Sequence, residues 1–459
     1  MLPKSLDRTI TNGSIGSRQR AARRARHRTR RCARSHGVTK DGIQTSALVE
    51  AKRRAKETTK KYAKSFYMAS LLMTSGRDVA YALYAWCREL DELVDTTTPT
   101  TTAVDAERAL DGVLHRLQQV FRGEIPPDAT YVDLALLDAV PRCVGLGVEP
   151  FVDMIAGMRT DIRRQRFETF ADVDLYAYRV AGTVALMILP ILTVGVNDDA
   201  KRLRLKEERG VALGKALQMT NIIRDVGEDR CRVPPRVYIA AEDLRLFNLT
   251  PEDVISMKNP TFAYKAAVEF QIQRALAYYR YANDGLQLLP SFSRPATSCI
   301  AGLYKKILLA VRENDYDNLN KRAFASTTTK VLVLPQIILR AFSKQVAVEA
   351  NDCDLFLNFS DMADIPRQVL MCKLLAGIKS DDEDSIISII EELKRDTGCG
   401  NAKQALEFED DDWLPWYTLR GSSNIIFDGY VDELIKVSQA DAANGEWVIY
   451  RRKAGKTGT

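Results

Sequence analysis

The stretch NIIRDVGEDR, residues 221–230, decides the fold and directs the search for a function. It continues the run GVALGKALQMTNII, residues 210–223, whose apolar residues recur at helical spacing, and the next proline is Pro234. Asp225 and Asp229 are four residues apart, so a helix places both carboxylates on one face. Like charges at this spacing repel each other unless a cation lies between them. The stretch predicts a long helix with a candidate cation site.

A second carboxylate pair lies earlier in the chain, in DELVD, where Asp91 and Asp95 have the same spacing. Two helices that face such pairs across a cavity would form an oxygen-lined site for a hard divalent cation. Mg²⁺ suits it best, with Mn²⁺ as its substitute, because Mg²⁺ takes few protein carboxylates and completes its shell with water and phosphate oxygens. One such pair alone is more often a solvated helix face.

The surroundings of the two pairs favour the functional interpretation. Arg88 lies three residues before Asp91, and Arg224 directly precedes Asp225. The neighbouring runs YALYAWC and ALQMTNII are too apolar for an outer helix face. Carboxylates and arginines beside an apolar wall suit a substrate with a diphosphate head and a hydrocarbon body.

The chain from residue 56 to residue 345 is predicted to be nearly all helical, because apolar positions recur at three and four and no alternating pattern appears. We expect an all-α bundle around a deep apolar cavity. Five breaks separate the helices. They are TTTPTTT (96–102), GEIPPD (123–128), CRVPPR (231–236), KNPT (258–261) and LPSFSRP (289–295).

Several motifs in this order resemble the squalene/phytoene synthase family, the head-to-head prenyl synthases. The resemblance extends from about residue 62 to about residue 339. It rests on YAKSFY (62–67), WCRELDELVD (86–95), PFVDMIAGMRTDI (150–162), YAYRVAGTVALM (176–187), LGKALQMTNIIRDVGEDR (213–230) and NDYDNLNKRAF (314–324). DELVD and DVGED resemble the phytoene-type members more than the squalene-type ones, and the resemblance also implies the isoprenoid-synthase fold.

The resemblance implies that two molecules of geranylgeranyl diphosphate condense through a cyclopropyl diphosphate to phytoene, the first committed step of carotenoid biosynthesis. No NAD(P)H is expected for that product. The implied catalytic residues are Asp91, Asp95, Asp225, Asp229 and Tyr176, and the four aspartates are the implied metal ligands. The implied substrate-binding residues are Lys64, Ser65, Tyr84, Arg88, Gln218, Asn221, Arg224, Tyr304 and Arg322.

The chain departs from the family pattern at three positions. The family usually has glycine where Ala185 stands, a non-basic residue where Arg179 stands and proline where Ala240 stands. The loop that contains Ala240 is interpreted as a variant lid. The small residues Ala181, Gly182 and Ala185 allow a close approach by another helix or by a polyprenyl tail, and the sequence favours the helix.

Two alternatives remain open. The first is a dehydrosqualene or squalene synthase that acts on farnesyl diphosphate, since the depth of a cavity is not readable from sequence. The second belongs to another class, a non-catalytic assembly or scaffold relative. Such proteins keep the fold and lose the aspartates, whereas all four aspartates stand here with Arg88 and Arg224.

The basic character of the chain comes from its beginning. Residues 1–40 hold twelve Lys or Arg and one acid, a net charge of +11, whereas the whole chain carries +6. The remainder therefore sums to −5, which excludes a basic nucleic-acid-binding body. Residues 1–55 have the composition of a transit peptide, so we expect a plastid enzyme; an RNA-binding arm and a polybasic membrane segment are the alternatives.

The remaining features concern the compartment and the end of the chain. Eight scattered cysteines without metal-type spacing indicate a reducing compartment. The longest apolar run, residues 184–196, is too short to span a bilayer, so we expect no transmembrane helix and peripheral contact with a membrane surface. Other carotenoid or isoprenoid enzymes are expected partners. Residues 346–459 form an extension of unknown role, with a short strand expected in GEWVIYRRKAGK (445–456).

Overall fold

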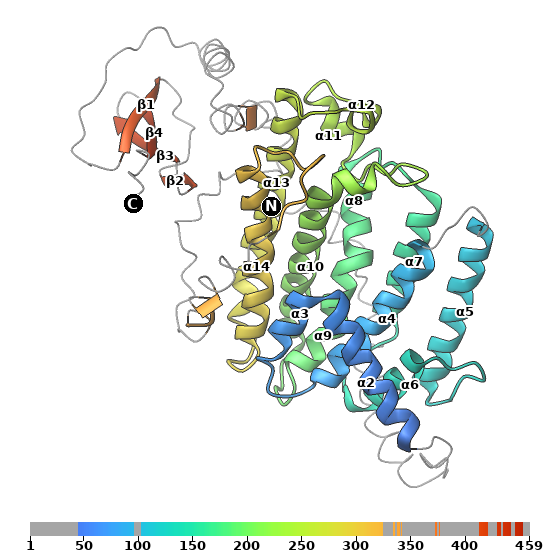
Figure 1. Cartoon of the computed structure of the whole chain (residues 1–459). Helices are drawn as coiled ribbons and strands as arrows, with labels where there is room; N and C mark the ends of the chain where they lie inside the picture. Colours follow the sequence, from blue (N-terminus) through green and yellow to red (C-terminus); the bar gives the residue numbers. More distant parts are fainter. Residues whose placement is uncertain are drawn as a thin grey trace, which may run out of the picture.

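The computed structural model describes residues 45–95 and 102–324, scattered positions between 334 and 376, and four strands between 413 and 452. Every regular element between residues 45 and 324 is helical, which confirms the all-α prediction for this part (Figure 1). The helices are α2 (Thr45–Tyr62), α3 (Lys64–Ser70), α4 (Arg77–Asp95), α5 (Ala103–Arg122), α6 (Tyr131–Ala139), η3 (Val140–Arg142), α7 (Glu149–Arg163), α8 (Phe170–Ala177), η4 (Tyr178–Gly182), α9 (Thr183–Leu192), α10 (Ala200–Asp229), α11 (Ala241–Arg245), α12 (Pro251–Ser256), α13 (Phe262–Leu286) and α14 (Arg294–Glu313).

The helix ends lie where the sequence predicts breaks. Four of the five predicted breaks fall between the end of one helix and the start of the next, and the fifth, residues 289–295, extends two residues into α14. Threonines satisfy the free N–H groups at several helix starts. Thr102 Oγ1 accepts from the backbone N–H of Asp105 across 3.2 Å at the start of α5, and the Asp105 carboxylate accepts in return from Thr102 N across 3.0 Å.

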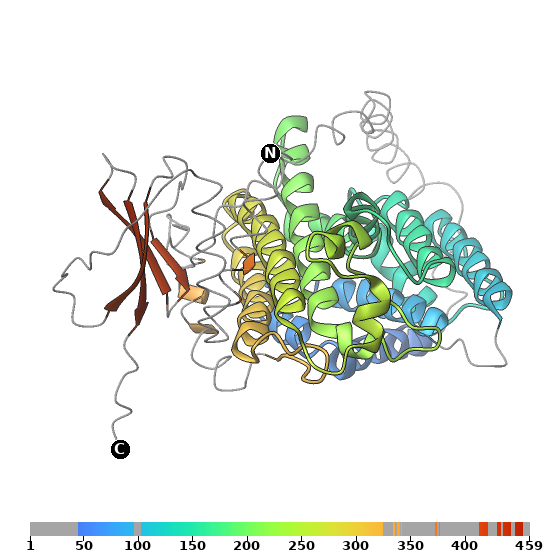
Figure 2. The ribbon, with the colours of Figure 1, turned by 90° about the horizontal axis from the view of Figure 1, so that it is seen from above.

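Two hydrophobic clusters form the core, and α10 contributes to the first of them. α10 packs against α13, α14, α9 and η4 (Figure 2). Around it lies the first cluster, with Tyr264 and Phe270 fully buried. The second cluster lies among α2, α4, α6 and α7, where Trp86 and Phe151 meet edge to face with ring centroids 4.8 Å apart. Val180 in η4 packs against both clusters and joins them.

Small residues let the helices approach closely around η4, a single π-helical turn. A Cβ added to Gly214 of α10 would lie 2.4 Å from the carbonyl oxygen of Ala181, and one added to Gly157 of α7 would lie 2.9 Å from Cβ of Arg179. Neither position has room for a side chain. The small residues of this region therefore serve helix packing, as predicted.

One helix among the described residues, Phe170–Leu192, is long and apolar enough to cross a membrane by length and composition alone. It is longer than the 13-residue run counted in the sequence, because the π-helical turn η4 joins α8 to α9 without a break. The core helix of a soluble protein meets the same criteria, and this helix packs against α7 and α10.

The C-terminal extension contains a four-stranded antiparallel sheet in the order β1-β4-β3-β2. Its strands are β1 (Trp413–Arg420), β2 (Gly429–Asp432), β3 (Ile435–Asp441) and β4 (Glu446–Arg452). The strand expected within residues 445–456 is confirmed as β4, and the all-α description does not extend to this segment. At the other end, α2 begins at Thr45, within the predicted leader, and buries Ala51 and Ala55 in the core.

Candidate functional site

The second acidic motif forms the last turns of α10, and two arginines hold its first aspartate. Arg224 donates from Nε to Oδ1 of Asp225 across 2.8 Å, and Arg322 donates from Nε to the same oxygen across 2.9 Å. Arg322 also donates from a terminal nitrogen to Glu228 across 2.6 Å. Asp225 is therefore a half-buried carboxylate bracketed by two guanidinium groups, an arrangement that binds anions and fixes their orientation.

Asp229, one turn further along α10, is in a different electrostatic environment. Burial raises the pKa of its carboxyl group to about 7, with the charges of Asp225 and Asp161 adding to the rise and Arg232 and Arg236 opposing it. Arg232 is its ion-pair partner, with Nε 3.2 Å from Oδ1. A carboxylate that is costly to ionise gains more from a nearby cation than an exposed one does.

Asn221 supplies an unpartnered oxygen on the same helix face. Its Nδ2 donates to Oε1 of Gln218 across 3.2 Å, while its Oδ1 is buried and has no hydrogen-bond partner within the described part of the chain. Buried polar atoms of this kind normally have a partner. An amide oxygen one turn before Asp225 fits a hard cation or a cation-bound water, so the residues present suit Mg²⁺ or Mn²⁺.

The first acidic motif lies on α4. Tyr84 stacks on Phe66 with ring centroids 5.8 Å apart, and the guanidinium of Arg88 lies 4.5 Å from the centre of the Tyr62 ring. Burial, and after it the charge of Asp91, raises the pKa of Tyr84 well above its ordinary value. Tyr84 and Asp91 are therefore neighbours on α4.

The two aspartate motifs are not joined in one cluster. Asp95 is the last residue of α4, and its side chain lies outside the described residues. Among the side chains that the structure does describe, no three His, Cys, Asp or Glu residues gather closely enough to hold a metal ion. The four-aspartate metal site therefore stays a prediction.

Tyr304 of α14 connects α4 to α10. It is close enough to Tyr84 to influence the pKa of that phenol, and it forms a side-chain hydrogen bond with Arg224. Through Tyr304, the structure brings the neighbourhood of Asp91 close to that of Asp225. One region therefore contains six of the predicted site residues that these contacts join: Tyr84, Asp91, Arg224, Asp225, Tyr304 and Arg322.

Among the described residues, no hydrogen bond or ion pair joins the side chains of Lys64 and Ser65 to this region. Lys64 is the first residue of α3 and is exposed, and Ser65 beside it is half-buried. Their predicted contact with diphosphate stays a prediction.

Tyr176 belongs to a buried hydrogen-bonded network next to Asp229. Its hydroxyl donates to Oδ2 of Asp161 across 2.9 Å, and the hydroxyl of Tyr238 donates to Oδ1 of the same carboxylate across 2.7 Å. Burial first, and then the charge of Asp161, raises the pKa of Tyr176 well above its ordinary value. Asp161 in turn raises the pKa of Asp229, so the network reaches the second acidic motif through charge.

Sequence reasoning missed Asp161, Tyr238 and Arg236 as members of this region. Asp161 lies within the quoted motif PFVDMIAGMRTDI, so a signal for it was present. Tyr238 and Arg236 gave none, because they reach the site only through the path of the loop after α10. There the backbone N–H of Val237 donates to the carbonyl of Gln165 across 3.0 Å.

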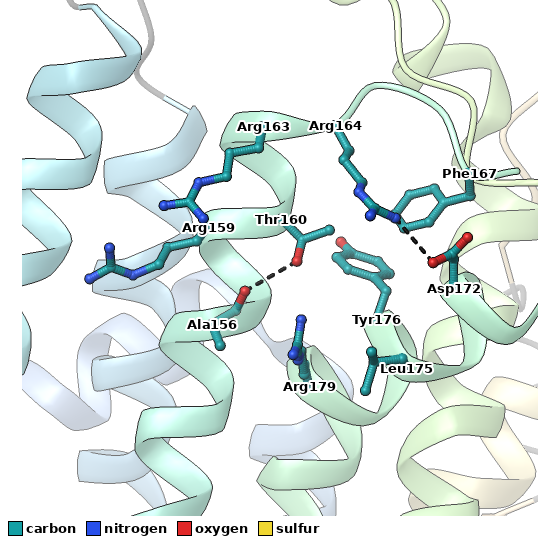
Figure 3. Close-up of a pocket in the computed structure, with 10 residues that line it drawn as sticks. All are labelled: Ala156, Arg159, Thr160, Arg163, Arg164, Phe167, Asp172, Leu175, Tyr176 and Arg179. Atoms are coloured by element: carbon teal, nitrogen blue, oxygen red, sulfur yellow. Dashed lines mark hydrogen bonds and ion pairs between the residues drawn. The ribbon is translucent and has the colours of Figure 1, made fainter. Parts of the chain in front are cut away.

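The structure also contains a cavity of about 360 Å³ between α7 and the α8–η4 segment. Its lining includes Arg159, Arg163, Arg164 and Arg179, together with Tyr176 (Figure 3). None of the four predicted metal-ligand aspartates lines it. This arginine-lined cavity is not the deep apolar one that the sequence predicts, and the apolar cavity stays a prediction.

Comparison with known proteins agrees with the fold and with the motifs. The chain is 41% identical to the phytoene synthase of Arthrospira platensis over 296 residues, which cover 62% of this chain and 92% of that protein. It is 40% identical to the chloroplastic phytoene synthase 3 of Zea mays over 314 residues, 68% of this chain and 70% of that one. The crystal structure of a dehydrosqualene synthase in complex with a ligand has a TM-score of 0.55 and 29% identity, and covers 63% of this chain and 96% of that one. Residues 59–329 match the family described as squalene/phytoene synthase, and the chain belongs to that family.

Proposed function

We propose that this protein condenses two molecules of geranylgeranyl diphosphate head to head, through a cyclopropyl diphosphate, to phytoene. The choice of substrate is supported by relatives named phytoene synthase, including the 15-cis-phytoene synthase of a Synechocystis strain, 38% identical over 302 residues. The observation that carries the chemistry is the position of Asp225 between Arg224 and Arg322, one turn after the unpartnered oxygen of Asn221.

The protein's own cations provide part of the chemistry. A diphosphate leaves only when the charge that develops on it is neutralised, and positioned guanidinium groups do this without reorganisation. Arg224 and Arg322 point at Asp225 and are the groups that would turn to the leaving diphosphate. Arg88, on the neighbouring helix α4, is the third such group.

Mg²⁺, or Mn²⁺ in its place, would be held by Asp91, Asp95, Asp225 and Asp229. When bound, the metal neutralises charge on the diphosphate as its C–O bond breaks. Asp229 would then ionise more readily than its present pKa of about 7 allows, since a cation favours the charged form.

The aromatic residues of this region provide the second requirement, a dry wall for a carbocation. Tyr84 and Phe66 stack beside Asp91, and Tyr304 and Tyr279 lie next to each other beside Arg224. Aromatic faces stabilise a nearby cation and exclude the water that would quench it. The final proton loss yields phytoene, and no reductant is needed for that product.

The setting of the reaction is part of the proposal. A C40 hydrocarbon product and plant relatives named chloroplastic support a plastid enzyme that works at a membrane surface, beside other carotenoid or isoprenoid enzymes. Residues 1–44 of the basic leader that would direct it there lie outside the described residues, and residues 45–55 belong to α2.

A second candidate is the condensation of two farnesyl diphosphates, favoured by the similarity to the dehydrosqualene synthase structure. Incubation of the full chain with geranylgeranyl diphosphate and Mg²⁺, without NADPH, separates the two. A C40 hydrocarbon with a conjugated-triene chromophore is expected in the organic extract from the native protein. It should be lost in Asp225→Asn. The matched control Asp284→Asn removes an exposed carboxylate of α13 and should keep the activity. A product from farnesyl diphosphate alone would move the assignment to the second candidate, and a folded protein that converts neither would overturn both.

A further inference from the structure

The cavity between α7 and the α8–η4 segment has the lining of an anion site, which we call the arginine groove. It is formed by Ala156, Arg159, Thr160, Arg163, Arg164, Phe167, Asp172, Leu175, Tyr176 and Arg179. Its volume of about 360 Å³ lies in the range of sites for small organic ligands. None of the proposed diphosphate-binding arginines lines it, but Tyr176 of its lining is hydrogen-bonded to Asp161 beside Asp229, so the groove adjoins the proposed reaction centre.

Three arginines of the groove are held in place by carboxylates and still have donors to offer. Arg159 donates to Glu107 across 2.7 Å and to Asp111 across 2.5 Å, and Arg163 donates from Nε to Glu107 across 2.6 Å. At the end of α7, Arg164 donates to Asp172 of α8, on the other wall, across 3.1 Å (Figure 3). A guanidinium has five N–H donors, so these contacts leave several of them for a ligand.

Arg179 differs from the other three. It is half-buried, and no carboxylate pairs with its guanidinium among the residues that the structure describes. Asp172, the acid in the lining, pairs with Arg164, and Asp161 is hydrogen-bonded to Tyr176 and Tyr238. The guanidinium therefore adds a positive charge that the neighbouring acids do not neutralise.

Close packing of the backbone fixes the position of Cα and Cβ of Arg179. Its Cβ would lie 2.9 Å from a Cβ built on Gly157, so η4 is pressed against α7 at this point. Figure 3 shows the Arg179 side chain between α7 and the segment that carries Leu175 and Tyr176. The side chains of Arg159 and Arg163 point away from Arg179, toward their carboxylate partners on α5. A half-buried charge on a fixed stretch of backbone suits a phosphate group, whose oxygens accept several N–H donors at once.

We propose that the arginine groove binds a phosphate-bearing ligand and that Arg179 is the residue that recognises it. The apolar side chains of Ala156, Phe167 and Leu175 leave room for a small organic body attached to the phosphate. The same chemistry is offered by a free diphosphate and by the headgroup of an anionic phospholipid. The two sources are separated by experiment.

Inorganic diphosphate is titrated calorimetrically into the full chain in EDTA, which removes divalent metal from the proposed reaction centre. Vesicles of phosphatidylcholine, with and without phosphatidylglycerol, are tested in parallel by co-sedimentation. Arg179→Gln is compared with Arg204→Gln, which removes an exposed arginine of α10 outside the groove. Arg179→Lys tests whether charge alone is sufficient.

The groove is a phosphate site if Arg179→Gln weakens one of the two binding modes by about tenfold or more while Arg204→Gln does not. Lysine at 179 should restore part of the affinity. The binding mode that is weakened identifies the ligand of the groove as free diphosphate or as phospholipid. Equal affinities in native protein and Arg179→Gln, in both arms and with unchanged melting temperature, would overturn the proposal, as would equal losses in the two glutamine variants.

Discussion

Arg322 donates from its Nε to Oδ1 of Asp225 across 2.9 Å, although 97 positions separate the two residues. The segment after α14 returns to α10 to make this contact. The amide of Asn318 donates to the carbonyl of Ile223 across 2.6 Å, and the backbone N–H of Gly227 donates to the carbonyl of Asn318 across 3.1 Å. The motif NDYDNLNKRAF is therefore held against the end of α10 by one side-chain and one main-chain hydrogen bond of Asn318. These bonds place Arg322 beside the carboxylate of Asp225.

This docking predicts that Arg322 acts on the reaction more than on stability. Arg322→Gln should lower kcat/KM for geranylgeranyl diphosphate by about 10- to 100-fold, the usual loss for one charged hydrogen-bonding group. Its effect on the melting temperature should be small, because the Arg322 side chain is partly exposed to solvent. Release of diphosphate measures the rate. Glu228→Gln is the control, since it removes the other partner of Arg322 and should change kcat/KM little; equal losses in both variants would contradict the assignment.

The buried carboxyl of Asp229 predicts a pH dependence of stability in the absence of metal. Its pKa is raised to about 7 in the folded protein, so it favours the folded state below its unfolded pKa, and this contribution is lost as pH rises toward 7. Between about pH 5 and pH 7 the native protein should lose roughly 2 kcal/mol relative to Asp229→Asn. Urea unfolding in EDTA measures the difference. A pH-independent difference between the two proteins would contradict the burial of an ionisable group at this position.

The paired hydroxyls on Asp161 distinguish a catalytic Tyr176 from a structural one. Tyr176→Phe and Tyr238→Phe each remove one hydrogen bond to the same buried carboxylate, at a cost of about 1 kcal/mol in stability. If Tyr176 takes part in the reaction, its variant should lose at least tenfold more kcat than the Tyr238 variant, at similar melting temperatures. Equal losses of kcat in the two variants would show that Tyr176 only positions Asp161.

The close approach of α10 and η4 predicts opposite effects of two alanine substitutions. Gly214→Ala should destabilise the protein by about 1–3 kcal/mol, because the new Cβ would lie 2.4 Å from the carbonyl oxygen of Ala181 and main chain must move. Gly112→Ala, on the exposed face of α5, should stabilise it by about 0.5–1 kcal/mol through helix propensity. Thermal unfolding measures both, and a neutral Gly214→Ala would contradict the described packing.

The helical framework was readable from the sequence because its signals are local. Proline, glycine and threonine clusters mark the ends of α4, α10 and α13, and these ends need no tertiary information. The spacing of Asp225 and Asp229 likewise predicted a shared helix face from the helical repeat alone.

The rest depends on contacts between distant segments. Nothing in the residues around Tyr238 indicated that its hydroxyl would share Asp161 with Tyr176, because that requires the loop after α10 to lie on residue 165. The π-helical turn η4 could not be predicted from the sequence either. It lengthens the apolar helix without an apolar pattern of its own. The arginine groove arises only when α7 and η4 come together.

The measurement that tests the central claim most directly is a competition in one tube. The full chain is given equal concentrations of geranylgeranyl and farnesyl diphosphate with Mg²⁺ and no NADPH, and the chain length of the hydrocarbon product is read by mass spectrometry. The account predicts a C40 hydrocarbon with a conjugated-triene chromophore as the main product. This product should be lost in Asp225→Asn. A C30 product from the same mixture, or a C40 product that survives in Asp225→Asn, would contradict it.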